Sequence, residues 1–187
     1  MIDLDAKETL KEAERSVKQI QKAVPRALSA AINRTTTGLR TEAVKKVRET
    51  YDIKASDVRP TFRLGRATPS NLEADIQSKG RAIPLIRFNT KPKAPPANGK
   101  RRLVTSSVKK SGGKKLLHAF VARVGGHIGV LERVGKSRLP LKELFGPSVP
   151  VMLNEPGITD HLNKEADRRM TERFDHELNR LLGGGTR

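Results

Sequence analysis

The chain has 187 residues and carries 38 Lys and Arg against 20 Asp and Glu, a formal net charge of +18 at pH 7. This excess indicates an anionic partner, which would be nucleic acid, an acidic protein surface or a membrane; a basic protein without such a partner is the alternative. The absence of cysteine excludes disulfides and cysteine-based zinc sites. No apolar run approaches the roughly 20 residues of a membrane span, and the acidic, polar amino terminus is not a secretory signal.

Residues 1–50 are predicted to be helical. Apolar residues recur at alternating steps of three and four, which places them on one face: Leu10, Ala13, Val17, Ile20 and Val24. Pro25 lacks an N–H and is tolerated in a first helical turn, so a second helix is predicted to begin there. Its buried side would carry Leu28, Ala31, Ile32, Leu39, Ala43 and Val47. We expect both faces to pack within their own domain.

Residues 51–134 are predicted to form strands and loops. The short apolar or alternating runs are "NLEADIQ" (71–77), "IPLIRF" (83–88), "RLVTSSV" (102–108), "HAFVARV" (118–124) and "IGVLERV" (128–134). Turn signals such as "KPKAPPANGK" and "KSGGKK" separate them. This pattern predicts one antiparallel sheet of about four or five strands with long exposed loops.

Residues 135–187 begin with "GKSRLPLKELFGPSVPVML", an apolar segment interrupted by prolines, and end in a predicted helix. Thr159 or Asp160 can cap this helix, and glycines 183–185 end it. One face carries Leu162, Ala166, Met170, Phe174, Leu178 and Leu181. The order of long amino-terminal helices, antiparallel sheet and closing carboxy-terminal helix predicts an α+β fold, and the length suits a single domain over 1–187.

The positive charge is concentrated in the predicted sheet. No Asp or Glu occurs from Ile76 to Leu131, and the basic residues gather in two groups: Lys100, Arg101 and Arg102, then Lys109, Lys110, Lys114 and Lys115. Flexible Lys and Arg side chains on loops can neutralise backbone phosphates. No aromatic residues interleave with them and no recognition-helix motif is present, so neither base stacking nor base readout is supported. An acidic neighbouring protein and a solvated hairpin remain alternatives.

The sequence gives no support for an enzyme, a metal site or a cofactor. His118 and His127 have no acid nearby in sequence, and His161 with Glu165 lacks the HExxH frame, so we expect a solvated surface there. The "DHE" run at 175–177 places its side chains in different directions on a helix. The glycine-rich segments match neither the P-loop nor the dinucleotide pattern.

Four segments, taken in order, carry a resemblance. They are "AINRT", "YDIKASDVR", "IPLIRF" and "GKSRLPLKELFGPSVP", followed by a last helix ending "RFDHELNRLL". From about Ala27 to Leu182 the chain resembles the minor tail protein Z family of tailed bacteriophages and prophages. The resemblance implies a structural tail-completion protein of the virion, assembled in the host cytoplasm, that acts at the head-proximal end of the tail and helps to join it to the neck. It further implies a ring, most often of six copies, with tail terminator, tail tube or neck and connector proteins as neighbours.

Under this resemblance the segment 135–153 would be laid by each copy on its neighbour, because prolines lower the entropy lost on docking. The predicted assembly interface comprises Arg138, Leu139, Pro140, Leu141, Leu144, Phe145, Gly146 and Pro147. Val149, Val151 and Met152 would add to the apolar area buried in this interface. Gly146 and Pro147 would set a turn. Packing of these residues on their own sheet is the alternative. The basic loops would face genomic DNA through its backbone, or acidic neighbours. A stand-alone basic nucleic-acid-binding protein is the rival function.

Overall fold

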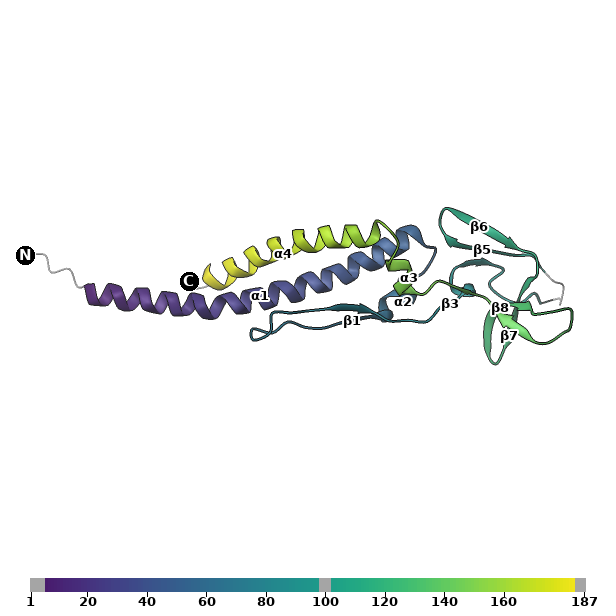
Figure 1. The fold of residues 1–187 in the computed structure, drawn as a ribbon, viewed down its shortest axis with the longest axis horizontal. Coiled ribbons are helices and arrows are strands. Elements are labelled where there is room, and N and C mark those ends of the chain that lie inside the picture. Colours follow the sequence, from purple (N-terminus) through teal and green to yellow (C-terminus); the bar gives the residue numbers. More distant parts are fainter. Residues whose placement is uncertain (1–5, 98–101, 184–187) are drawn as a thin grey trace, which may run out of the picture. The chain divides into compact units, whose positions relative to one another are not determined.

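The computed structural model describes residues 6–97 and 102–183 (Figure 1). Two compact units divide the chain, and each combines pieces that are distant in sequence. Unit 1 comprises Met1–Leu39, Leu64–Ile76 and Asn163–Arg187; unit 2 comprises Arg40–Arg63 and Gln77–Leu162. The fold is α+β, as predicted, with two long helices and several small sheets. That residues 1–187 form a single domain, as the chain length suggested, stays a prediction.

Helix α1 runs without interruption from Ala6 to Thr50 and contains Pro25. The prediction of a second helix beginning at Pro25 is therefore wrong. An interior proline removes one backbone hydrogen bond and costs about 3 kcal/mol. The flanking residues offset this cost, because Ala23 and Ala27 are buried on either side of the proline and strong helix formers surround it.

The apolar face predicted on α1 is buried only in part. Ala31, Ala43 and Val47 are 0%, 3% and 0% exposed, and Leu28, Ile32 and Leu39 are half-buried. Leu10, Val17 and Ile20, however, are exposed. The expectation that the whole face packs within its own domain is wrong for these three residues.

In unit 1, α1 packs against α4 (Ile158–Gly183), most of which belongs to this unit. Arg34 of α1 and Glu177 of α4 form an ion pair of 2.9 Å. Asn33 of α1 binds the third piece of the unit, Leu64–Ile76, through two hydrogen bonds. Its side-chain N–H donates to the Ala67 carbonyl at 2.8 Å, and its side-chain oxygen accepts from the Ala67 N–H at 3.0 Å. The apolar residues predicted for one face of α4 are all half-buried, which confirms that face.

In unit 2, the core joins the last turns of α1 to residues of the small sheets and to the short helices α2 (Ala55–Val58) and α3 (Val149–Leu153). Phe88, Val47 and Met152 are among its largest fully buried side chains. The remaining buried core residues are Ala43, Val44, Tyr51, Ile53, Val58, Phe62, Leu85, Val104, Ala119, Val121, Val130 and Val149.

The strands form four small sheets in the described part of the chain, where the sequence predicted one. β1 (Phe62–Leu64) joins β2 (Ile76–Ser78), and β3 (Ile83–Pro84) pairs antiparallel with β10 (Phe145–Gly146). β4 (Asn89–Lys91), β5 (Val104–Lys109) and β6 (Gly112–Leu116) form an antiparallel sheet, as do β7 (Ala119–Val124), β8 (His127–Arg133) and β9 (Leu141–Glu143).

One reason for the division into small sheets is visible in "IPLIRF". A single strand was expected there, but a 3-10 turn at Leu85–Arg87 follows the two residues of β3. Another 3-10 turn, Arg59–Thr61, precedes β1. Pro84 cannot donate to a ladder, so it ends the pairing of β3.

Helix α4 begins at Ile158, before both predicted caps, Thr159 and Asp160. Gly157 supplies the carbonyl that accepts from the His161 N–H at 3.2 Å, so Thr159 and Asp160 lie in the first turn. The Thr159 hydroxyl instead donates to the Leu153 carbonyl at 3.1 Å. Gly183 is the last helical residue; Gly184 and Gly185 lie outside the described residues.

Candidate functional site

The segment 135–153 is anchored on its own unit by backbone hydrogen bonds. β9 pairs with β8, with Glu143 opposite Leu131 and Leu141 opposite Arg133. The Leu144 N–H donates to the Val130 carbonyl at 2.8 Å, and the Leu144 carbonyl accepts from the Leu85 N–H at 2.9 Å. The segment is therefore held in place before any partner binds.

Some side chains of this segment point away from the core. Leu139, Phe145 and Val151 are 67%, 51% and 59% exposed. The other predicted interface residues are exposed (Arg138 and Pro140) or half-buried (Leu141, Leu144, Gly146 and Pro147). Val149 and Met152 are fully buried in the core of unit 2, so their predicted contribution to a contact between copies is wrong. We call Leu139, Phe145 and Val151 the apolar rim.

Gly146 does not set a turn, contrary to the prediction. It lies in β10 opposite Ile83. A Cβ atom at Gly146 would stand 2.5 Å from Cε2 of Phe88, so the residue is needed for the close approach of that ring. The half-buried Pro147 follows the strand and leads to α3.

The second basic group lies on a hairpin and not on a long loop. Lys109 ends β5, Lys114 and Lys115 lie in β6, and Lys110 is in the turn between the strands. All four are exposed. Lys109, however, forms an ion pair of 2.5 Å with Glu155, so three lysines remain available. We call Lys110, Lys114 and Lys115 the basic hairpin.

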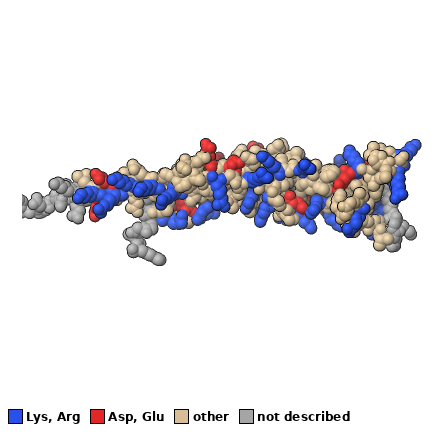
Figure 2. Space-filling model, turned by 90° about the horizontal axis from the view of Figure 1, so that it is seen from below, with Lys and Arg blue, Asp and Glu red and all other residues tan. Residues whose placement is uncertain are grey.

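The first basic group falls partly outside the structure. Lys100 and Arg101 lie outside the described residues, and Arg102 is exposed just before β5. Figure 2 shows Lys and Arg along the whole face in view, with scattered Asp and Glu between them.

A cavity of about 320 Å³ in unit 2 has cationic side chains as half of its lining residues. It is lined by Arg48, Lys54, Arg87, Lys93 and Lys110, with Tyr51, Asp52, Ile53, Phe88 and Asn89 completing the wall. We call it the basic pocket. Arg87 pairs with Asp57 at 3.3 Å, and Asp52 accepts from the Ser107 hydroxyl at 2.9 Å. The other four cations have no ion pair within the described part of the chain.

Lys93 is held in a fixed position at the basic pocket. Its ammonium group donates to the Ile86 carbonyl at 3.0 Å and also to the Phe88 carbonyl. Burial lowers the pKa of Lys93, and the neighbouring charge of Lys54 lowers it further. An oxyanion in this pocket would relieve the crowding of like charges.

Sequence reasoning missed the basic pocket because its residues come from several segments. Arg48 belongs to α1, and Lys54 belongs to the connection after α1. Both lie outside the stretch from Ile76 to Leu131 in which the sequence has no Asp or Glu. Positive charges near the end of a predicted helix are ordinary, so only the folded arrangement reveals their convergence.

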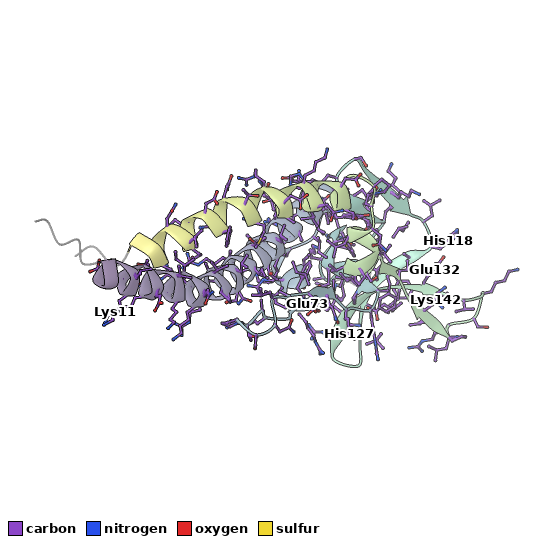
Figure 3. The ribbon with its side chains drawn as sticks, turned by 60° about the vertical axis from the view of Figure 1, so that its left-hand side comes forward. Lys11, Glu73, His118, His127, Glu132 and Lys142 are labelled. Carbon is purple, nitrogen blue, oxygen red and sulfur yellow. The ribbon has the colours of Figure 1, made fainter. Side chains whose placement is uncertain are left out.

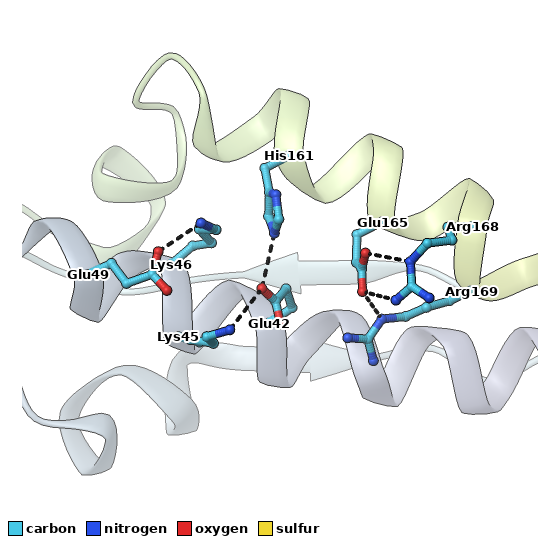
Figure 4. A network of polar contacts seen from close by, with 8 residues as sticks. All are labelled: Glu42, Lys45, Lys46, Glu49, His161, Glu165, Arg168 and Arg169. Atoms are coloured by element: carbon cyan, nitrogen blue, oxygen red, sulfur yellow. Dashed lines mark hydrogen bonds and ion pairs between the residues drawn. The ribbon is translucent and has the colours of Figure 1, made fainter.

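The polar groups considered as metal ligands are engaged separately (Figure 4). In unit 2, His161 Nε2 lies 3.0 Å from the Glu42 carboxylate. In unit 1, Glu165 accepts from Arg168 and Arg169, whose hydrogen bonds lower its pKa to about 2. Among the described residues, no group of three or more His, Cys, Asp or Glu could hold a metal ion.

The sequence places no acid near His118 or His127, but in the structure His127 does have an acidic neighbour. His127 lies 3.1 Å from Glu143 of β9, an acid that is distant in sequence. His118 is exposed just before β7 (Figure 3). Figure 3 also labels Glu132 of β8 and Lys142 of β9, which lie opposite each other in the register of these two strands. His127 and Glu143 form a two-residue contact between strands.

The fold and its surfaces describe an α+β protein that exposes apolar side chains and basic side chains in unit 2. The sequence model of the family described as prophage minor tail protein Z (GPZ) matches residues 8–184. The chain belongs to this family, and it is a structural component of a phage tail, not an enzyme. No curated protein and no solved structure matches the chain. No helix among the described residues is long and apolar enough to cross a membrane.

Proposed function

We propose that this tail protein assembles into a ring, of six copies, at the head-proximal end of the tail. There the ring completes the tail and helps to join it to the neck of the virion, after assembly in the host cytoplasm. The tail terminator, the tail tube and the connector are its neighbours. The observation that supports this proposal is the exposure of the three apolar side chains of the apolar rim.

The apolar rim suits a contact between copies for two reasons. Leu139, Phe145 and Val151 expose apolar area that water solvates poorly. The backbone beneath them is fixed by β8 and by the Leu144 hydrogen bonds. A preorganised segment loses less conformational entropy when it docks. Such contacts also offset the repulsion between copies that each carry a net charge of +18.

The basic hairpin and the basic pocket give the ring an electrostatic contact. We assign them to acidic surfaces of adjoining rings or to the backbone of the genomic DNA. Contacts to phosphate are independent of sequence and weaken with salt. Loose binding of this kind suits DNA that must leave through the tail.

Cryo-electron microscopy of intact particles tests the proposal directly. We expect a ring of this chain between the tail tube and the head connector. Density elsewhere in the tail would contradict the assigned place, and a single unassociated copy would contradict the ring. DNA binding by the isolated chain without any place in the particle would favour the nucleic-acid-binding alternative.

Substitutions in the apolar rim test the contact between copies. Phe145→Ala and Leu139→Ser should prevent assembly while the chain still folds, because both side chains are more than half exposed. Leu141→Ala should weaken assembly as well. Leu72→Ser, an exposed apolar residue of unit 1, is the matched control. Equal assembly of all four variants would contradict the role of the apolar rim.

A further inference from the structure

One face of α1 carries mainly apolar or small residues at regular spacing along most of the part of the helix that lies in unit 1. The members of this repeat follow alternating steps of three and four residues: Leu10, Ala13, Val17, Ile20, Val24, Ala27, Ala31, Arg34 and Gly38. This spacing averages 3.5 residues, which is the period that two helices need to stay in contact over several turns. The repeat therefore indicates a face that is built to pack against another helix.

Over its second half this face has a partner within the chain. Ala27 and Ala31 are fully buried. Arg34 contacts Glu177 of α4 at 2.9 Å. A Cβ atom at Gly38 would stand 2.6 Å from Nη1 of Arg169 of α4. The seam between α1 and α4 thus lies on the same face as the repeat.

Over its first half the face lies beyond the reach of α4. The two helices run antiparallel, because Gly38 meets Arg169 and Arg34 meets the later Glu177. α4 ends at Gly183, which is six residues past Glu177. Since both helices rise equally per residue, α4 extends to about residue 28 of α1. Leu10, Val17 and Ile20 are accordingly 62%, 52% and 45% exposed. We call Leu10, Ala13, Val17 and Ile20 the amino-terminal stripe.

The charges beside the amino-terminal stripe permit contact between identical chains. The residues that flank it directly are Glu14, Ser16, Gln21 and Ala23, none of which is basic. Lys11, Arg15, Lys18 and Lys22 lie farther round the helix, and Figure 3 shows Lys11 projecting from this part of α1. In a chain of net charge +18, a face free of neighbouring bases is the place where a second copy meets least repulsion.

We propose that the amino-terminal stripes of the copies of this chain face one another around the axis of the ring, as a bundle of parallel helices. The inference rests on the proposed ring, and it names a second contact besides the apolar rim. Copies related by rotation about one axis keep the same helix direction along that axis, so the helices are parallel. About two heptads are too short to hold two chains together alone. The stripe therefore contributes within the ring.

The absence of cysteine allows a direct test in the full chain. Leu10→Cys places one thiol in the amino-terminal stripe, and Arg15→Cys places one on the opposite side of the same helix. We expect mild oxidation of Leu10→Cys to give a covalent dimer at least about ten times faster than oxidation of Arg15→Cys. Both variants should unfold at the wild-type temperature, because both positions are exposed.

The outcomes separate this proposal from the ring itself. Equal rates for the two variants, in a chain that still forms rings, would overturn the helix contact and leave the ring standing. Cross-linking only between Leu10→Cys and Val24→Cys chains would overturn the parallel arrangement. A chain that stays monomeric and does not cross-link would contradict both proposals. Cross-linking of Leu10→Cys in particles to a different protein would show that the stripe has another occupant.

A second variant measures the contact by sedimentation. Val17→Lys should weaken self-association at least about tenfold, because it places a base in the stripe of every copy. Arg15→Ala removes a charge from the outer side and should leave self-association unchanged or stronger. Identical sedimentation of Val17→Lys and the wild type would overturn the proposal.

Discussion

Arg34 of α1 and Glu177 of α4 form an ion pair of 2.9 Å in which the glutamate side chain is completely buried and the arginine is half exposed. Arg180 reaches the other oxygen of the same carboxylate at 2.8 Å. The contact from Arg34 Nε to Oε1 is a charge contact without an aligned hydrogen bond, whereas Oε2 accepts a hydrogen bond from Arg180. Glu177 thereby connects the two helices of unit 1.

The first prediction concerns this buried carboxylate. Glu177→Gln should lower the free energy of unfolding by about 1–3 kcal/mol, because two guanidinium groups lose their shared anion. Glu172→Gln, which removes an exposed charge from the same helix, should change it by less than about 0.5 kcal/mol. Denaturant unfolding followed by circular dichroism measures both, and equal stability of the two variants would contradict the role of Glu177.

The second prediction concerns the approach of Gly146 to Phe88. Gly146→Ala should destabilise unit 2 by about 1–3 kcal/mol, because the new methyl group would overlap the ring of Phe88. Gly135→Ala is the control, since no atom lies within 4 Å of a Cβ built there. Thermal unfolding distinguishes them. A wild-type melting temperature for Gly146→Ala would show that the ring can move aside at no cost.

The third prediction uses Tyr51, the one tyrosine of a chain without tryptophan. Its hydroxyl donates to Glu155 at 2.5 Å, and burial together with this bond raises the pKa of Tyr51 to about 12. The folded state binds this proton more tightly, so its contribution to stability is complete below pH 10 and is lost as the pH rises towards 12. Absorbance at the phenolate band should therefore show a midpoint near 12 in the folded chain.

A variant separates the two causes of this raised pKa. Glu155→Gln should move the midpoint downwards but keep it above the ordinary value of 10, because burial remains. Glu132→Gln is the control and should leave the titration unchanged. A midpoint near 10 in the folded wild type would contradict the hydrogen bond between Tyr51 and Glu155.

The fourth prediction concerns Pro25 inside α1. Pro25→Ala should stabilise the helix by about 1–3 kcal/mol, because it restores a backbone hydrogen bond and removes the clash of the ring with the preceding turn. The expected result is a higher melting temperature with unchanged or increased helical circular dichroism. Ala30→Pro is the opposite control and should be destabilising. A lower melting temperature for Pro25→Ala would show that unit 1 depends on the proline ring at this position.

The fifth prediction concerns the basic hairpin. Replacing Lys110, Lys114 and Lys115 together by Gln should weaken binding to a short DNA duplex without lowering the melting temperature, since exposed lysines contribute little to stability. The slope of log affinity against log salt should fall by about 0.9 for each lysine that contacts a phosphate. Lys109 is left intact because it pairs with Glu155.

A variant with Lys11, Lys18 and Lys22 replaced by Gln loses the same net charge from α1 and is the control for this experiment. If both triple variants lose affinity equally, DNA responds to net charge alone and the basic hairpin is not a contact site. Loss of binding to an acidic polypeptide, with unchanged DNA binding, would assign the hairpin to a protein neighbour.

The sequence predicted the features that depend on local periodicity and missed those that depend on tertiary contacts. The face of α4 from Leu162 to Leu181 was correct because 3.6-residue spacing determines it. Glu177 was not recognised, because a glutamate beside Asp175 and His176 has the pattern of a solvated surface. Its burial depends on Arg34, which is 143 residues earlier in the chain.

The same distinction holds for the candidate sites. Exposure of Leu139 and Phe145 agrees with the predicted interface segment, but Val149 and Met152 proved to be core. All four are apolar residues in one proline-rich stretch, and only the fold determines which of them face inwards. The ring came from family resemblance and the DNA contact from the concentration of positive charge in the predicted sheet, and both remain proposals.

The seam between α1 and α4 also has a consequence for the order in which the chain is made. Arg34 leaves the ribosome long before Glu177, and at 5–20 residues per second the interval is about 7–30 s. Throughout that time the whole repeat from Leu10 to Gly38 lacks its partner helix. Once α4 is made, it covers this face from about residue 28 of α1 onwards and leaves only the amino-terminal stripe of the repeat uncovered.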